Sequence, residues 1–276
     1  MPRTAVALLA LVAFAGNARA QHPLSHPVDA VEVRFAQRQP VIAYTLRVDS
    51  ADLSGFGVEL RIRNAPDTFR LAMMAHPEYD DRYWRYLEGI HAESRVSQAR
   101  PAAVTREDSA LWRVVAPGGE VTVRYRIRLP VADNAMRGAW RPFLAPTGGL
   151  VGGPHSFLYV VGSTLAPVHV ALELPSSWDI ATGLVPSADR HHYFAPSADV
   201  LVDAPILVGR LANWSFVADD VPHRIVYWAR PGATQFDTTA FADGVKRLVD
   251  QTLLLFGRAP YREYAFLVQD GAYGAL

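Results

Sequence analysis

The stretch VTVRYRIRL, residues 121–129, decides the fold class because its apolar and polar residues alternate strictly. Every odd position is apolar, and the even positions carry threonine or arginine. Successive side chains of a β-strand point to opposite faces, so this stretch predicts a strand with one face on a core and the other in water. Residues 168–174 repeat the same alternation.

Short candidate strands of this kind follow one another from Val31 to about Val217. Turn signals separate them, for example at Asn64-Ala-Pro66, Pro117-Gly-Gly119 and Gly148-Gly149. Many short strands without helical periods between them predict a mainly β fold, with an antiparallel β-sandwich or saddle domain at the N-terminal side. The strands expected in this region are 31–35, 41–48, 58–62, 69–74, 111–115, 157–161, 201–208 and 214–217.

The pattern changes after Asp220. Residues 223–230 predict one more strand, and a helix is expected from an N-cap at Asp237 to about Phe256, with Gly257 ending it. Residues 264–268 are continuously apolar and predict a strand buried on both faces. Strand, helix and strand in this order indicate an α/β layer, whose apolar surface exceeds what these residues can cover. We therefore expect a second, incomplete domain.

The first twenty residues have the three parts of a secretory signal peptide. Arg3 precedes the apolar run of residues 5–15, and Ala18-Arg19-Ala20 supplies an A-x-A cleavage site. We expect cleavage before Gln21 and an exported product, either periplasmic or secreted. The apolar run is too short to cross a bilayer, and no other stretch approaches that length, so no transmembrane segment is expected after cleavage.

Composition and missing motifs exclude several kinds of chemistry. The 27 basic and 27 acidic residues cancel, which argues against a nucleic-acid partner because such proteins usually carry a basic excess. The chain has no cysteine, so thiol catalysis, disulfides and cysteine-ligated zinc are excluded. The motif HExxH is also absent, and with it the two histidines and the glutamate of a thermolysin-type zinc site.

The remaining polar and aromatic clusters each have a structural interpretation and a functional alternative. We interpret His155-Ser156 as part of a plain loop, with a nucleophile–base pair as the alternative. A metal site is the alternative for the two histidine pairs, but neighbouring strand residues point to opposite faces, and Pro23 and Pro27 disfavour a helix at His22 and His26. We interpret the aspartates as solvated turn residues, with a calcium site as the alternative. For the aromatics we favour core and cross-strand packing in a strand, with a sugar- or peptide-stacking surface as the alternative. The residues concerned are His155-Ser156, His191-His192, His22 with His26, Asp199, Asp203, Asp219, Asp220, Tyr79, Tyr83, Trp84 and Tyr86.

Six short segments occur in a distinctive order along the second half of the chain: SFLY at 156–159, VALELP at 170–175, WDIATGL at 178–184, DVLVDAPILVG at 199–209, HRIV at 223–226 and YAFL at 264–267. In this order and spacing, residues 156–276 resemble the glycyl-aminopeptidase family of zinc metallopeptidases, whose members often carry a C-terminal PDZ domain. Residues 43–128 resemble the family's N-terminal β domain more loosely.

The resemblance implies a domain order: a signal peptide at 1–20, an N-terminal β-sheet domain at 21–220 and, at 221–276, the incomplete α/β start of a thermolysin-like peptidase domain. Gly274, Ala275 and Leu276 match the first three positions of the family's Gly-Gly-Leu-Glu-His loop, with alanine at the second position. The resemblance implies a substrate contact for these three residues. It transfers no catalytic residue and no metal ligand to this chain.

Two functions from different classes follow. The first is the N-terminal part of an exported zinc-dependent aminopeptidase that hydrolyses peptides with a small N-terminal residue, Gly or Ala. The resemblance implies Zn²⁺ for the full-length family member and none bound by this chain, which is then inactive alone. The second is a non-enzymatic exported β-sandwich module that binds peptide or glycan unaided through its aromatic residues.

Overall fold

The computed structural model describes residues 40–74, 82–95, 99–129, 142–233 and 235–270. The chain divides into two compact units, Met1–Arg38 and Gln39–Leu276. The first unit lies wholly outside the described residues, and so do the expected signal peptide and the expected strand at 31–35. The architecture below is that of the second unit.

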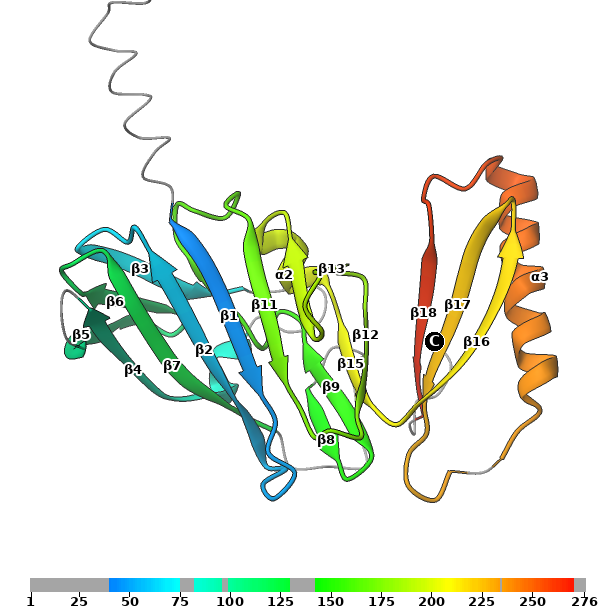
Figure 1. Cartoon of the computed structure of the whole chain (residues 1–276), viewed down its shortest axis with the longest axis horizontal. Coiled ribbons are helices and arrows are strands. Elements are labelled where there is room, and N and C mark those ends of the chain that lie inside the picture. Colours follow the sequence, from blue (N-terminus) through cyan, green and yellow to red (C-terminus); the bar gives the residue numbers. More distant parts are fainter. Residues whose placement is uncertain (1–39, 75–81, 96–98, 130–141, 234, 271–276) are drawn as a thin grey trace, which may run out of the picture. The chain divides into compact units, whose positions relative to one another are not determined.

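A sheet of eleven strands forms the largest part of this unit (Figure 1). Its strand order is β10-β3-β6-β5-β4-β7-β2-β1-β11-β14-β13. Neighbours run antiparallel, except that β1 and β11 are parallel. The strands are β1 Val41–Arg47, β2 Gly55–Arg63, β3 Thr68–Met73, β4 Leu87–Arg95, β5 Ala99–Asp108, β6 Leu111–Val115, β7 Glu120–Arg128, β10 Leu158–Val160, β11 Val168–Glu173, β13 Val185–Pro186 and β14 His192–Ala195.

Two smaller sheets complete the β structure. The four-stranded sheet has the order β12-β15-β9-β8, and the three-stranded sheet has the order β16-β17-β18. In the latter, β16 and β17 form an antiparallel hairpin, whereas β17 and β18 are parallel. The strands are β8 Phe143–Ala145, β9 Gly148–Gly152, β12 Asp179–Thr182, β15 Ile206–Gly209, β16 Leu211–Ala218, β17 Val221–Trp228 and β18 Tyr264–Gln269.

Helix α3 (Thr238–Phe256) connects β17 to β18 and lies along one face of the three-stranded sheet (Figure 1). Two shorter helices are the 3-10 turn η1 (Tyr83–Tyr86) and α2 (Ala198–Asp203). None of the helices in the described ranges is long and apolar enough to span a bilayer. The predicted fold class, mainly β with an α/β element at the end, is confirmed.

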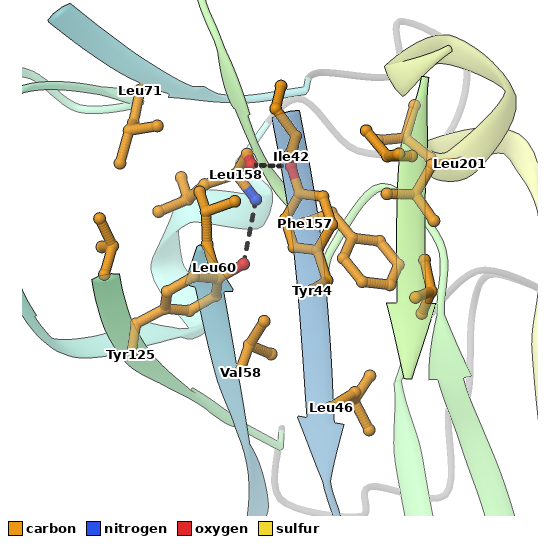
Figure 2. Packing of buried hydrophobic residues seen from close by; sticks show 14 of the residues in the cluster. Ile42, Tyr44, Leu46, Val58, Leu60, Leu71, Tyr125, Phe157, Leu158 and Leu201 are labelled. Carbon is orange, nitrogen blue, oxygen red and sulfur yellow. Dashed lines mark hydrogen bonds between the residues drawn. The ribbon is translucent and has the colours of Figure 1, made fainter. Parts of the chain in front are cut away.

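The alternation at residues 121–129 forms strand β7 as predicted. Val121, Val123, Tyr125 and Ile127 are buried, because they face the core together with the inward residues of β1 and β2. Figure 2 shows this core around Tyr44 of β1, with Phe157 and Leu158 close to the Tyr44 ring. The outward face carries arginines and carboxylates in cross-strand ion pairs, for example Arg124 with both Glu59 and Glu93.

The ends of α3 agree with the sequence prediction. Asp237 caps the helix, since its Oδ1 accepts a hydrogen bond from the Ala240 N–H at 2.9 Å. The ring centroids of Phe236 and Phe241 lie 5.5 Å apart across this cap, and this contact fixes how the chain enters the helix. Gly257 ends the helix with φ at 87°, a left-handed conformation that glycine adopts readily.

Three predictions of local secondary structure are wrong. The expected strand at 201–208 begins as helix α2, because the Ser197 hydroxyl caps it by accepting from the Val200 N–H, and only β15 after Pro205 is extended. The expected turn at Gly148-Gly149 is the start of strand β9. The expected aromatic strand forms η1, in which Tyr83 and Tyr86 are buried one turn apart.

The α/β element leaves apolar surface exposed, as the sequence predicts. Strand β18 is half-buried, so its predicted burial on both faces is wrong in this chain. The C-terminal half of α3 exposes four large apolar side chains, with exposed fractions of 69–79%: Leu248, Leu254, Leu255 and Phe256.

Candidate functional site

The residues expected to contact substrate, Gly274, Ala275 and Leu276, lie outside the described residues. The structure describes the chain up to Asp270. The Asp270 N–H donates to the Trp228 carbonyl oxygen at 2.9 Å, so the end of β18 is held beside the last residue of β17. The contacts around Trp228 show how this last described part of the chain is positioned.

Trp228 joins the three-stranded sheet to the four-stranded one. Its buried indole packs against Phe143 of β8, with ring centroids 5.0 Å apart, and lies over Gly148 at the start of β9. A Cβ at Gly148 would lie 2.5 Å from Trp228 Nε1 and 2.3 Å from the Val208 carbonyl oxygen, and its φ of 151° disfavours other residues. Only glycine fits, so the indole approaches the backbone directly.

His223 of β17 holds the connection between α3 and β18. Its ring is fully buried and stacks on Phe216, with centroids 5.0 Å apart and planes inclined by 6°. Nδ1 lies 2.9 Å from the Val221 carbonyl oxygen, which can only accept, so we assign the proton to Nδ1. Nε2 then accepts from the Tyr261 hydroxyl at 3.1 Å. This histidine is a structural residue that fixes Tyr261 ahead of β18.

His155 and Ser156 are buried core residues rather than a nucleophile and its base. The Ser156 hydroxyl donates to the Val151 carbonyl oxygen at 2.6 Å, and its own carbonyl accepts from Tyr125 Oη at 2.8 Å. Tyr125 Oη also accepts from the Leu158 N–H at 3.1 Å, while Tyr44 Oη donates to the Leu158 carbonyl oxygen at 2.6 Å (Figure 2). The two tyrosine hydroxyls thus form hydrogen bonds with both the N–H and the carbonyl oxygen of Leu158.

Burial raises the pKa of Tyr44 and of Tyr125 well above the ordinary phenol range. Both hydroxyls are therefore protonated near neutral pH and remain hydrogen-bond donors. Together with the buried position of Ser156, this indicates that the network stabilises the fold and does not transfer protons.

The metal alternatives gain no support from the part of the chain that the structure describes. Within it, no group of three or more His, Asp or Glu side chains could hold a metal ion. His191 lies in a turn with φ at 61°, and its Nε2 accepts from Arg190 Nε. His22 and His26 lie outside the described residues. The described histidines and carboxylates do not provide the ligand set of a zinc ion, and we derive no catalytic step through zinc for them.

The aromatic cluster packs inward, as its structural interpretation predicts, although not in a strand. Tyr83 and Tyr86 are buried, and Tyr79 lies outside the described residues. Trp84 is covered by the Arg106 guanidinium, which lies 5.1 Å from its ring centroid and 5.6 Å from that of Trp112. The arginine occupies the face that a stacking ligand would need.

An open groove of about 630 Å³ lies at the ends of β1, β2 and β11. Gly57 forms its floor, and Arg47 and Arg126 are the residues opposite Gly57 on the two neighbouring strands. The sequence analysis did not identify this groove, because Arg47, Gly57 and Arg126 are far apart in the chain and only strand register brings them together. The rest of its lining is Val48, Asp49, Ser50, Gly55, Phe56, Leu172, Glu173, Leu174, Pro175 and His191.

The comparison with protein families identifies the class of protein to which the chain belongs. The model of the Peptidase M61 N-terminal domain matches residues 43–210, which is more than half of the chain. The chain therefore belongs to this family, and its relationship to metallopeptidases, predicted from the sequence, is confirmed. The match ends one residue after β15, directly before the three-stranded sheet begins.

A solved structure has the same fold over most of this chain. A crystal structure of an aminopeptidase N family protein from Idiomarina loihiensis is 24% identical, with a TM-score of 0.72, and the match covers 83% of this chain. It covers 39% of that protein, so this chain spans about two fifths of its length. An M1 zinc metallopeptidase from Deinococcus radiodurans is 14% identical, with a TM-score of 0.43, over 87% of this chain and 58% of that one. No curated protein matches the chain.

Proposed function

We propose that this chain is the N-terminal part of an exported zinc-dependent aminopeptidase that removes small residues, Gly or Ala, from the N-terminus of peptides. The observation that carries the proposal is the Peptidase M61 N-terminal domain at residues 43–210, followed by the β17–α3–β18 element. In this proposal the zinc ion and its ligands belong to a part of the enzyme beyond these residues.

The proposal assigns each part of the chain a task. Residues 1–20 direct export, 21–220 form the β domain and 221–276 begin the peptidase domain. Strand β16, at 211–218, pairs with β17 across this division, so the two domains share the three-stranded sheet. Gly274, Ala275 and Leu276 contact the substrate.

A comparison of two preparations tests the proposal. One is the protein isolated at its native length from its source, and the other is the purified segment 21–276. Both are assayed with glycyl-, alanyl- and leucyl-p-nitroanilide, before and after treatment with a zinc chelator. We expect the native protein to release p-nitroaniline from the glycyl and alanyl substrates faster than from the leucyl one, and to lose activity with the chelator until zinc is restored.

The segment 21–276 is expected to release none, with circular dichroism as the control that it is folded. N-acetyl-glycyl-p-nitroanilide is the matched substrate without a free amine, and an aminopeptidase leaves it intact. Chelator-sensitive activity of the isolated segment would contradict the assignment of zinc to another part of the enzyme. An inactive native protein that binds peptide or glycan would favour the non-enzymatic module.

A further inference from the structure

Strand β16 is an outer edge of the three-stranded sheet and lacks the features that usually protect such an edge. It has eight residues, pairs with β17 without a bulge, and contains no charged residue and no proline. Charged side chains, prolines, bulges and very short edge strands are what proteins use to prevent pairing with another chain. The edge strands of the other two sheets, β10, β13, β8 and β12, have only two to four residues. By contrast, β16 is a long edge that can accept a further strand.

The register of the β16–β17 hairpin shows which backbone groups of β16 face outward. Asp219 and Asp220, both with positive φ, form a two-residue turn, so Ala218 and Val221 are a hydrogen-bonded pair. Because bonded and non-bonded pairs alternate along the hairpin, the residues of β16 that direct their N–H and C=O groups to the open side are Leu211, Asn213, Ser215 and Val217. Within the described residues, these groups have no backbone partner, and the Leu211 carbonyl oxygen accepts at 3.4 Å from the Asn213 side chain.

Helix α3 adds an apolar side to the same edge. The helix packs against β16 (Figure 1), with Val249 buried. Leu248 and Leu255 are seven residues apart and share one side of the helix, about a quarter to a third of a turn from Val249. A helix that joins parallel strands makes a right-handed crossover, and in this hand the side with the two leucines is turned past β16 and away from β18. The two leucines are 69% and 76% exposed.

The chain continues from the opposite edge of this sheet. The strand order β16-β17-β18 places β16 and β18 at the two edges, and residues 271–276 follow β18. Consecutive elements are usually neighbours in space, so a further strand of the same chain adds most simply beside β18. This topology leaves the edge of β16 open.

A second copy of the chain supplies both of the partners that this edge needs. Two antiparallel β16 strands related by a twofold axis at Trp214 place Asn213 opposite Ser215 and Leu211 opposite Val217. Each of these pairs joins residues with outward backbone groups, so the outward N–H and C=O groups of both strands find partners. No charged side chains meet in this pairing, because β16 contains none. The same axis brings the apolar sides of the two α3 helices to one face of the joined sheet.

The surface available is enough for a stable dimer. The exposed side chains of Val217, Leu248 and Leu255 each offer on the order of 100 Å² of apolar area. An eight-residue strand adds an edge about 27 Å long and about 10 Å thick. Together these make on the order of 600 Å² per copy, at the lower end of the range for specific interfaces, about 1,200–2,000 Å² over both partners.

We propose that this edge binds a second copy of the chain through antiparallel pairing of the two β16 strands, with the apolar sides of the α3 helices packed together. The proposal concerns assembly and does not depend on the proposed peptidase activity.

Sedimentation equilibrium of the native-length protein tests the proposal over a range of protein concentrations. Mass spectrometry of the denatured chain gives the mass of one copy. We expect a reversible equilibrium between this mass and twice this mass. A monomer at every concentration, as when another part of the enzyme covers β16, overturns the proposal, and so does an assembly larger than a dimer.

Two pairs of variants locate the interface. Ser215→Pro removes an outward N–H from β16 and leaves its pairing with β17 intact, since proline is tolerated where the N–H of an edge strand faces solvent. We expect it to weaken dimerisation at least about tenfold, because each copy loses a hydrogen bond across the axis. Ser215→Ala keeps this N–H and should retain the dimer. Circular dichroism checks that each variant is folded.

The second pair tests the helix and remains decisive if Ser215→Pro does not fold. Leu248→Glu places a charge on the apolar side of α3 and should weaken dimerisation at least about tenfold. Leu254→Glu is its control, since Leu254 is as exposed but lies on another side of the helix. Unchanged dimerisation in folded Ser215→Pro or in Leu248→Glu overturns the proposal, as does an equal loss in the corresponding control.

Discussion

Replacement of Tyr125 by phenylalanine removes one oxygen atom from the core and leaves the ring in place. That oxygen donates to the Ser156 carbonyl oxygen at 2.8 Å and accepts from the Leu158 N–H at 3.1 Å. Tyr125 is only 4% exposed, so water cannot replace either bond. A buried polar group that loses its partner costs about 1–3 kcal/mol, and we therefore expect Tyr125→Phe to lower the free energy of unfolding by about 2–5 kcal/mol.

Urea unfolding of the purified protein, followed by tryptophan fluorescence and circular dichroism, measures this loss. We expect a lower transition midpoint with an unchanged slope, because the surface exposed on unfolding stays the same. Tyr193→Phe is the matched control, since Tyr193 is half-buried and its hydroxyl forms no hydrogen bond with another described residue; its effect should be within about 0.5 kcal/mol. A loss below that value for Tyr125→Phe would refute the reasoning.

The double variant with Tyr44→Phe tests whether the two tyrosines act on the same segment. Tyr44 Oη donates to the Leu158 carbonyl oxygen, and Tyr125 Oη accepts from the N–H of the same residue. Once one tyrosine has released Leu158, the other bond contributes less, so the two losses should differ from additivity by at least about 0.5 kcal/mol. Additive losses would show that the two bonds act independently.

Three further substitutions have defined outcomes. Burial alone would raise the pKa of Glu59, but the hydrogen bond from Arg124 and the charges of Arg61, Arg124 and Arg47 outweigh it, so the pKa lies below the ordinary 4.5. The ionised Glu59 carboxylate therefore stabilises the fold above pH 4.5, and this stabilisation is lost as the pH falls through the lowered pKa. Glu59→Gln should cost about 1–3 kcal/mol at pH 7 and flatten the acid limb of the stability profile, and an unchanged profile in urea unfolding would contradict this. Gly148→Ala should destabilise the protein by more than about 2 kcal/mol, because its Cβ would lie 2.3 Å from the Val208 carbonyl oxygen; a thermal midpoint equal to that of the parent protein would argue against the close approach of Trp228. Asp237→Ala should cost about 1 kcal/mol through loss of the N-cap bond to Ala240, seen as faster amide exchange in the first turn of α3, while Asp237→Asn should retain most of the cap.

The strands that a local pattern could predict are those with one buried face. Strand β7 satisfies this condition, because its apolar residues alternate with arginines that remain in water. Strand β9 does not, because all five of its residues are buried and three of them are glycines, which resemble a turn in the sequence. Helix α2 is hard to predict because its apolar residues Leu201 and Val202 lie shortly before strand β15 and look like part of that strand. The N-cap residue Ser197 is the signal in the sequence that indicates a helix there.

The candidate site could be predicted only in part, because its geometry depends on contacts between distant residues. The segment at 274–276 was identified by resemblance, and the anchoring of Asp270 on Trp228 follows only from the parallel pairing of β17 and β18. The groove at Gly57 depends on the register of three strands, and no local pattern encodes that register. Composition alone could not show that Arg47 and Arg126 lie on either side of a glycine.

The size of the native protein tests the central claim most directly. An extract of the source is probed with an antibody raised against residues 21–276, and the mass of the recognised protein is compared with the 30.3 kDa of this chain. If the chain is the N-terminal part of an aminopeptidase, the band lies well above 30.3 kDa and the immunoprecipitated protein releases p-nitroaniline from glycyl-p-nitroanilide. A band slightly below 30.3 kDa, without hydrolytic activity, would contradict the account.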